Sequence, residues 1–234
     1  MIESLPAYVS ITFILTTFVT VGFLTHSIKS RVDDEFPGKL AIALLFFWLI
    51  FQAVVAISGL YLITDSFPPR IFLFAVAPAL LTILLYFVFF RSNFIELLPL
   101  KVLTWIHVIR IPVELVLYWL FLGGLVPREM TFEGWNFDIL SGITAPIIAL
   151  VAFRGGSVNR PLLIVWNITA LVLLFNIVAV AVMALPGPMQ QIAFDRPNIA
   201  VTFFPFIWLP AVVVPIVFFS HLASLWKLIR GSVK

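Results

Sequence analysis

The stretch Leu40-Ala-Ile-Ala-Leu-Leu-Phe-Phe-Trp-Leu-Ile-Phe-Gln-Ala-Val-Val-Ala-Ile-Ser-Gly-Leu-Tyr-Leu62 carries no charged residue. A helix rises about 1.5 Å per residue, so a helix of this length can cross the roughly 30 Å hydrocarbon layer of a bilayer. The apolar side chains follow one another without the polar alternation that is typical of a barrel strand. The stretch therefore predicts a transmembrane helix.

Further apolar runs lie on both sides of this stretch, and the chain is 62% hydrophobic and only 11% charged, with a mean hydropathy of +1.16. Soluble domains carry about 25% charged residues, so the composition excludes an ordinary soluble protein. We expect an all-α polytopic membrane protein, a bundle of seven transmembrane helices that forms one domain over residues 1–234. The predicted spans lie near residues 7–28, 40–62, 71–90, 100–125, 139–154, 162–185 and 203–226.

The basic residues predict the orientation of these spans, because Lys and Arg collect on the cytoplasmic side of a membrane. Three of them lie on one side, namely Arg70, Arg128 and Arg196. Ten lie on the other side, namely Lys29, Arg31, Lys39, Arg91, Lys101, Arg154, Arg160, Lys227, Arg230 and Lys234. We therefore expect the N-terminus outside and the C-terminus in the cytoplasm, in a cell membrane of the bacterial inner-membrane type.

Composition also limits the chemistry of the chain. It has no cysteine, which excludes disulfides, thiolate metal ligands and a cysteine nucleophile. The net charge of +3 comes from residues that flank the spans, so nucleic-acid binding is not indicated. The N-terminal residues lack the basic segment and the cleavage site of a signal peptide, so the first apolar run is expected to remain as a span.

The fourth span is the one that carries charged residues deep inside. Its polar residues follow one another at steps of three or four, namely Thr104, His107, Arg110, Glu114 and Tyr118. This spacing places them on one face of a helix. A charged side chain in the middle of a span costs about 2.5–3.5 kcal/mol, so this polar face is expected to point into the bundle or into a wet cavity.

Two interpretations of this polar face stay open. Arg110 and Glu114 are four residues apart and are expected to pair along the helix, which would make them a structural pair. Alternatively they form a binding or proton-handling centre, as ionisable residues within membranes often do. Pro112 between them is expected to kink the helix, because it cannot donate to the carbonyl four residues before it.

Depth along the helices suggests companions for this face. His107 and His221 each lie about two turns from the cytoplasmic end of their span, and Asn167 belongs to the same layer. Gln52 and Asn176 are expected nearer the middle or just outside that layer. The predicted ligand-binding set is therefore His107, Arg110, Glu114, Tyr118, Asn167, Asn176 and His221, with Glu114, His107 and Arg110 as catalytic candidates.

No cofactor follows directly from these residues. A retinal Schiff base needs a lysine in the middle of the last span, and residues 203–226 contain none. A metal ion or haem held by His107 and His221 is one arrangement that stays open. The triplet Pro112-Val113-Glu114 is similar to Pro-x-Glu motifs of membrane cyclases that act on isoprenoids, but the second carboxylate of those motifs is missing.

Three hypotheses on function remain. The first is a membrane protein whose intramembrane polar pocket binds a small hydrophobic or amphipathic molecule or a lipid, with a sensory role that would need a partner protein or a homo-oligomer. The second is a membrane-embedded enzyme acting on a lipid or isoprenoid, with Glu114 or His107 as acid–base and Arg110 holding the substrate. The third is a small proton-coupled transporter that uses the polar face as a relay.

Overall fold

The computed structural model describes residues 5–32 and 35–231, and these residues form helices and loops without any β-strand. The prediction of an all-α protein is confirmed. The helices are α1 (Ala7–Lys29), α2 (Phe36–Ile57), α3 (Ala77–Phe89), α4 (Leu100–Trp105), α5 (Arg110–Leu122), α6 (Ile139–Ala152), α7 (Arg160–Met183) and α8 (Val214–Arg230). A π-helical turn precedes each of α3 and α8, at Phe72–Val76 and Leu209–Val213.

Six helical segments in the described residues are long and apolar enough to cross a membrane. They are Ala7–Lys29, Phe36–Ile57, Phe72–Phe89, Leu100–Leu122, Arg160–Met183 and Leu209–Arg230. The remaining apolar helix, α6, has 14 residues and is therefore about 21 Å long. The chain thus has six to seven long apolar helices, which is compatible with a helical bundle in a membrane.

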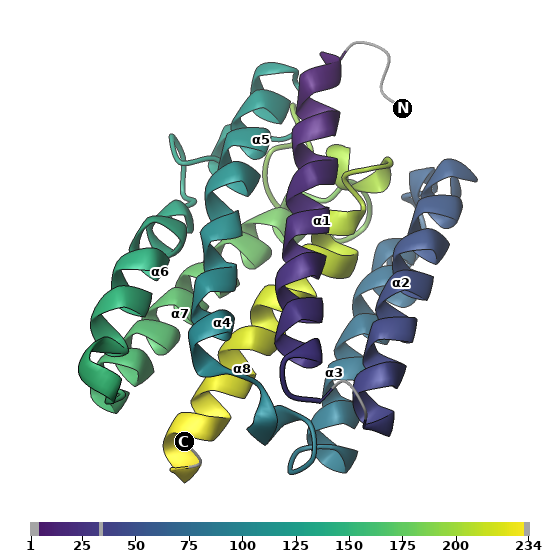
Figure 1. The fold of residues 1–234 in the computed structure, drawn as a ribbon. Helices are drawn as coiled ribbons and strands as arrows, with labels where there is room; N and C mark the ends of the chain where they lie inside the picture. The colour runs from purple at the N-terminus through teal and green to yellow at the C-terminus, as the bar shows by residue number, and fades with distance from the viewer. Residues whose placement is uncertain (1–4, 33–34, 232–234) are drawn as a thin grey trace.

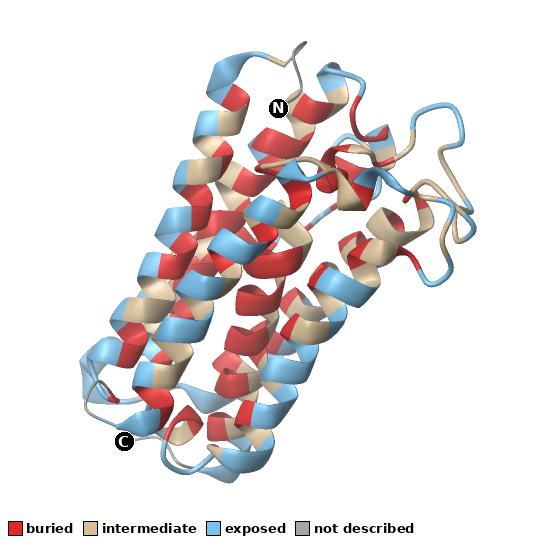
Figure 2. Ribbon diagram, turned by 90° about the vertical axis from the view of Figure 1, so that its right-hand side faces the viewer, coloured by how far each residue is buried: buried red, intermediate tan, exposed pale blue. Residues whose placement is uncertain are grey.

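The helices pack side by side, with α1, α5 and α8 in the middle of the bundle (Figure 1). The α6 and α7 helices lie on one side of this centre, and α2 and α3 lie on the other. The buried stretches of the helices face the interior of the bundle and the exposed stretches face outward (Figure 2). Large apolar residues such as Phe47, Leu84 and Val165 are exposed, whereas Arg110 and Glu114 are buried. This pattern is the reverse of a soluble protein and fits a surface that faces lipid.

Two predicted spans are displaced along the sequence. The span expected at 40–62 begins at Phe36 and ends at Ile57, because Gly59 adopts a left-handed conformation (φ +79°) that ends the helix. The span expected at 203–226 begins only at Leu209 and continues to Arg230. Residues 203–208 are mainly turns, and Pro205 therefore lies before the helix.

Proline residues leave helix carbonyls without their usual donor, and side chains of other helices fill the gap. Pro215 cannot donate to the carbonyl of Ala211, and Trp48 Nε1 of α2 donates to that oxygen at 2.8 Å. Pro78 likewise cannot donate to the carbonyl of Phe74, which accepts from Gln52 Nε2 at 2.7 Å. These bonds attach α2 to α8 and α3 at points where each helix is irregular.

The fourth span is interrupted instead of being one regular helix. Between α4 and α5 the chain tightens into a 3-10 turn, Ile106–Ile109, which contains His107. Pro112 follows this turn, and its ring and missing N–H disfavour a regular α-helical bond to the carbonyl of Val108. The expected irregularity therefore takes the form of a tightened turn. His107 lies in this 3-10 turn, whereas Arg110 and Glu114 lie in the regular helix α5 that follows.

The α5 and α6 helices approach closely at Gly142, and this approach generates a prediction on stability. A Cβ atom there would lie 2.9 Å from Ile111 Cγ1 and 3.2 Å from Arg110 Cβ. We expect Gly142→Ala to lower the unfolding temperature in detergent, at a cost of about 1–3 kcal/mol from overpacking. Gly22 of α1 is the control, because a Cβ there would meet no atom within 4 Å. Equal melting temperatures for Gly142→Ala and Gly22→Ala would contradict the close approach.

Candidate functional site

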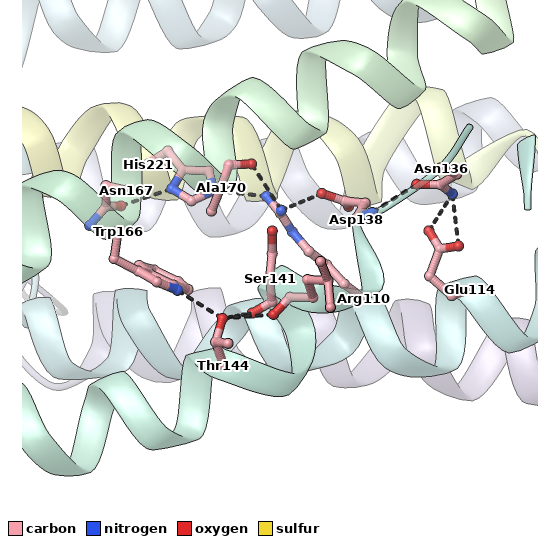
Figure 3. Close-up of polar contacts among 11 residues, drawn as sticks. Arg110, Glu114, Asn136, Asp138, Ser141, Thr144, Trp166, Asn167, Ala170 and His221 are labelled. Atoms are coloured by element: carbon pink, nitrogen blue, oxygen red, sulfur yellow. Dashed lines mark hydrogen bonds and ion pairs between the residues drawn. The ribbon is translucent and has the colours of Figure 1, made fainter. Parts of the chain in front are cut away.

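Arg110 lies at the centre of a buried hydrogen-bonded chain that joins four parts of the fold (Figure 3). Its Nη1 forms an ion pair with Asp138 Oδ1 at 2.6 Å and donates to the carbonyl oxygen of Ala170 at 3.1 Å. Its Nη2 lies 2.7 Å from His221 Nε2. The first residue of α5 is thereby bound to the start of α6, to α7 and to α8.

The contact with Arg110 fixes the tautomer of His221. A guanidinium only donates, so His221 Nε2 accepts and carries no proton. His221 Nδ1 therefore holds the ring proton and donates to Asn167 Oδ1 at 2.8 Å. The amide of Asn167 is oriented in turn by its donation to the carbonyl of Leu163 at 2.8 Å. His221 is thus held as a neutral imidazole with both nitrogens engaged.

Asn136 connects the other end of the chain to Glu114. Its Nδ2 lies 2.6 and 2.7 Å from the two carboxylate oxygens of Glu114 and donates also to the carbonyl of Met130 at 3.0 Å. Its Oδ1 accepts from the backbone N–H of Asp138 at 2.9 Å. Asn136 and Asp138 therefore bring the loop between α5 and α6 into the protein interior, where both side chains are buried.

The expected pairing of Arg110 with Glu114 is wrong. The ion pair of Arg110 runs to Asp138, 28 positions along the chain, and Glu114 is held by Asn136. Side chains four residues apart on a helix lie near each other, but this spacing does not make them partners. A residue from another part of the chain can pair with Arg110 instead, as Asp138 does. Within the described residues, the carboxylate of Glu114 has no basic side chain within 4.0 Å.

The structure brings the two histidines together. The rings of His107 and His221 stack with centroids 4.0 Å apart and planes 21° from parallel, and Trp166 packs against both. His107 is completely buried, and neither of its ring nitrogens has a hydrogen-bond partner among the described residues. His107 therefore belongs to this cluster by packing and stands outside the hydrogen-bonded chain.

Two predicted site residues do not reach the chain. Tyr118 is half-buried and packs on Phe132 with ring centroids 4.9 Å apart. Asn176 is exposed and donates to the carbonyl of Trp135 at 2.6 Å. Both residues instead contact the loop between α5 and α6. Gln52 is likewise separate, because it accepts from the hydroxyl of Tyr61 at 2.6 Å beside α3.

The two histidines do not fit a shared metal ion or haem. The lone pairs of an imidazole lie in the ring plane, so two stacked rings cannot both direct a nitrogen to one atom between them. Both nitrogens of His221 are also engaged by Arg110 and Asn167. In the described residues no group of three or more His, Cys, Asp or Glu is arranged to hold a metal ion.

A cavity of about 260 Å³ lies beside this chain, between α3, α5, α7 and the beginning of α8. Its wall is apolar except for three residues, Glu114, Asp138 and Asn198. Apolar side chains such as Leu174, Val178 and Phe218 line the remainder. An apolar cavity with a few convergent polar groups is the usual form of a small-molecule site.

A second cavity, of about 300 Å³, lies between α1, α2, α3 and α8. Its polar side chains are already engaged. Trp48 donates to Ala211, Thr82 Oγ1 donates to the carbonyl of Pro78 at 2.9 Å, and the hydroxyl of Tyr86 donates to that of Pro37 at 3.0 Å. This cavity therefore offers a ligand hydrocarbon contacts, whereas the first cavity also offers carboxylates.

Sequence reasoning missed Asn136 and Asp138, which it placed in an outer loop. One signal was available, because the apolar run from 139 is the shortest of the seven. At about 21 Å, α6 is shorter than the hydrocarbon layer, so one of its ends has to lie below the membrane surface. Asp138 directly precedes α6, so its carboxylate lies at the end of the helix that is below the membrane surface. A carboxylate at this depth can serve as the counter-ion of a buried guanidinium.

The fold and this buried polar chain define a helical, multi-pass membrane protein. Residues 68–229 match the model of one family, described as Domain of unknown function (DUF8737), and the chain belongs to that family. No curated protein and no solved structure matches the chain. The buried polar chain and the residues that line the cavity beside it fall within the matched residues.

The ion pair generates a prediction that separates Asp138 from Glu114. Arg110→Met and Asp138→Asn each leave one buried charge without its partner, so each should cost about 3–5 kcal/mol. The double variant should lose less than the sum of the two, measured as unfolding temperature in detergent. Arg110→Met combined with Glu114→Gln is the comparison, and its losses should be closer to additive. A larger coupling for Glu114 than for Asp138 would contradict the pairing.

Proposed function

We propose that this chain is an integral membrane protein that binds a small amphipathic molecule in the cavity between α3, α5, α7 and α8. The apolar part of the ligand lies against the helix side chains, and its polar end lies by Glu114 and Asp138. The observation that carries this proposal is the presence of two buried carboxylates in the wall of an otherwise apolar cavity. Carboxylates are costly to bury, so their place at the cavity favours contact with a ligand.

The catalytic hypothesis has less support from the geometry. Of the candidates Glu114, His107 and Arg110, Glu114 alone is among the residues that line this cavity. His221 cannot act as a base while Nε2 accepts from Arg110. A proton relay along the polar residues also has little support. Within the described residues no hydrogen bond joins His107 to the chain, so a proton has no path through His107. Binding is therefore the function that we propose.

We also propose seven spans, with the N-terminus outside and the C-terminus in the cytoplasm of a bacterial-type inner membrane. Here α6 is the short seventh span, and the loop that precedes it fills the outer part of its path through the membrane. Basic residues support the orientation, because Lys29, Lys39 and Arg91 flank helix ends that lie together with the end of α8 (Figure 1). Any signal from the bound ligand would reach a partner protein or a second copy of the chain.

The ligand-binding proposal is tested by filling the cavity. We expect a small amphipathic molecule to co-purify with the unmodified chain. Ala181 lines the cavity, so Ala181→Leu should remove the space for this molecule and abolish its co-purification. Mass spectrometry of the purified protein, native and after extraction, measures this loss. Ala79→Leu is the matched control, because Ala79 lines the second cavity. If Ala181→Leu retains the same bound species at the same stoichiometry, the cavity is not its site.

The orientation can be tested cleanly because the chain has no cysteine of its own. Asp195 and Ser157 are both exposed and lie in the loops at opposite ends of α7. In intact cells, a membrane-impermeant maleimide should label Asp195→Cys, while Ser157→Cys should react only after the membrane is opened. Labelling of Ser157→Cys in intact cells, with none of Asp195→Cys, would reverse the orientation.

A further inference from the structure

The cavity of about 260 Å³ opens on the outer surface of the helix bundle. Among the described residues that line it, two are exposed, namely Leu80 of α3 at 42% and Phe175 of α7 at 53%. Both side chains are apolar and belong to helices that are long and apolar enough to cross a membrane, so the surface around them is suited to hydrocarbon. The opening between α3 and α7 is therefore a lateral one.

This opening lies well inside the spans. Leu80 lies eight residues after the beginning of its span, and Phe175 lies eight residues before the end of its span. At a rise of 1.5 Å per residue, each lies about 12 Å from that end. The two ends lie on the same side of the bundle, because Gly187 after α7 approaches the carbonyl of Thr64 in the loop before α3. Both helices thus place the opening at about the same depth, within the hydrocarbon layer.

The cavity is closed toward the loops on this side of the bundle. Met130, Leu185 and Val201 line it there, and each of them is at most 6% exposed. Met130 belongs to the loop between α5 and α6, whereas Leu185 and Val201 belong to the segment between α7 and α8. Among the described residues, the exposed part of the cavity wall is therefore at Leu80 and Phe175 and not at the loops.

The size and depth of the cavity limit the kind of ligand. Ligand pockets usually have about 300–1,000 Å³, so a cavity of about 260 Å³ is too small to enclose a molecule with a long hydrocarbon chain. The remainder of such a chain would pass out through the opening. A charged group in the middle of a span costs about 2.5–3.5 kcal/mol, so entry at this depth favours a molecule whose polar end is uncharged.

We propose that the cavity takes up its ligand sideways from the bilayer, between α3 and α7, and that this ligand is a membrane-dissolved, long-chain molecule with an uncharged polar end. The polar end lies by Glu114 and Asp138, and the hydrocarbon chain passes between Leu80 and Phe175 into the lipid. This inference rests on the proposed function and names the route and the class of its ligand. A long-chain alcohol is the simplest molecule of this class, because its hydroxyl can donate to a carboxylate oxygen.

Two photoactivatable forms of 1-hexadecanol test the path of the hydrocarbon chain. One carries a diazirine beside the hydroxyl and the other carries it at the far end, and each is added to the purified protein in lipid nanodiscs. Peptide mapping by mass spectrometry locates the labels. The first probe should label the buried wall, for example Leu117, and the second should label Leu80, Phe175 or the surrounding lipid. Labels of the second probe at Leu185 or Val201 would overturn the lateral route.

A bulky side chain at the opening should hinder entry. Leu80→Trp should slow the labelling of the cavity wall by the first probe about tenfold, measured by flash activation at increasing times after the probe is added. Leu81→Trp is the matched control, because Leu81 is also exposed on α3 but does not line the cavity. Equal rates for Leu80→Trp and the unmodified protein would overturn entry between α3 and α7.

Competition tests the uncharged polar end. Unlabelled 1-hexadecanol should displace the first probe at concentrations at least about tenfold lower than hexadecyl sulfate or hexadecyltrimethylammonium. Equal displacement by either charged compound would overturn the uncharged end and leave the lateral route standing.

The outcomes also separate this inference from the proposed function. Ala181→Leu fills the cavity and should abolish the labelling of its wall. If the wall is labelled and Ala181→Leu removes the labels, while the second probe labels the loops, the route is wrong and the proposed function stands. No label in the wall from either probe, or labels that Ala181→Leu does not reduce, would overturn the proposed function itself.

Discussion

The burial of Arg110 is the constraint on which the arrangement of the other helices depends. A guanidinium in the middle of a hydrocarbon layer requires a counter-charge and acceptors for its N–H groups. The protein supplies partners for the two Nη atoms, namely Asp138, the carbonyl of Ala170 and His221, which belong to three other parts of the fold. Because these partners are distant in sequence, satisfying one side chain fixes the relative positions of α5, α6, α7 and α8.

The same contacts make His221 a structural residue. Its lone pair faces Arg110 and its N–H faces Asn167, so protonation would place two donors against each other. A histidine held in this way orients its neighbours but exchanges no proton in this arrangement. The polar chain thus has two roles. Arg110 and its partners hold the helices together, while Glu114 and Asp138 also line the cavity.

The sequence predicts local features of this fold better than its tertiary pairings. Apolar runs place the helices, because burial in lipid selects for continuous hydrophobic stretches. The equal depth of His107 and His221 follows from counting turns, and the structure stacks the two rings. The partner of Arg110 could not be read in this way, because Glu114 and Asp138 are both near it and loop geometry decides between them. Asn176 is predicted to lie in the polar site but is exposed on α7. Its direction depends on the rotation of α7 about its own axis, which the hydrophobicity of the span does not determine.

The two cavities indicate why the polar residues are distributed unevenly. Trp48, Thr82 and Tyr86 line the second cavity, but each donates to a carbonyl, so that space is apolar in effect. In the first cavity Glu114 lines the wall and has no basic side chain within 4.0 Å among the described residues. Folding alone gains nothing from a buried carboxylate without a cation, and an apolar residue there would cost less. A carboxylate without a nearby cation in an otherwise apolar cavity wall is therefore the feature on which the proposed ligand binding rests.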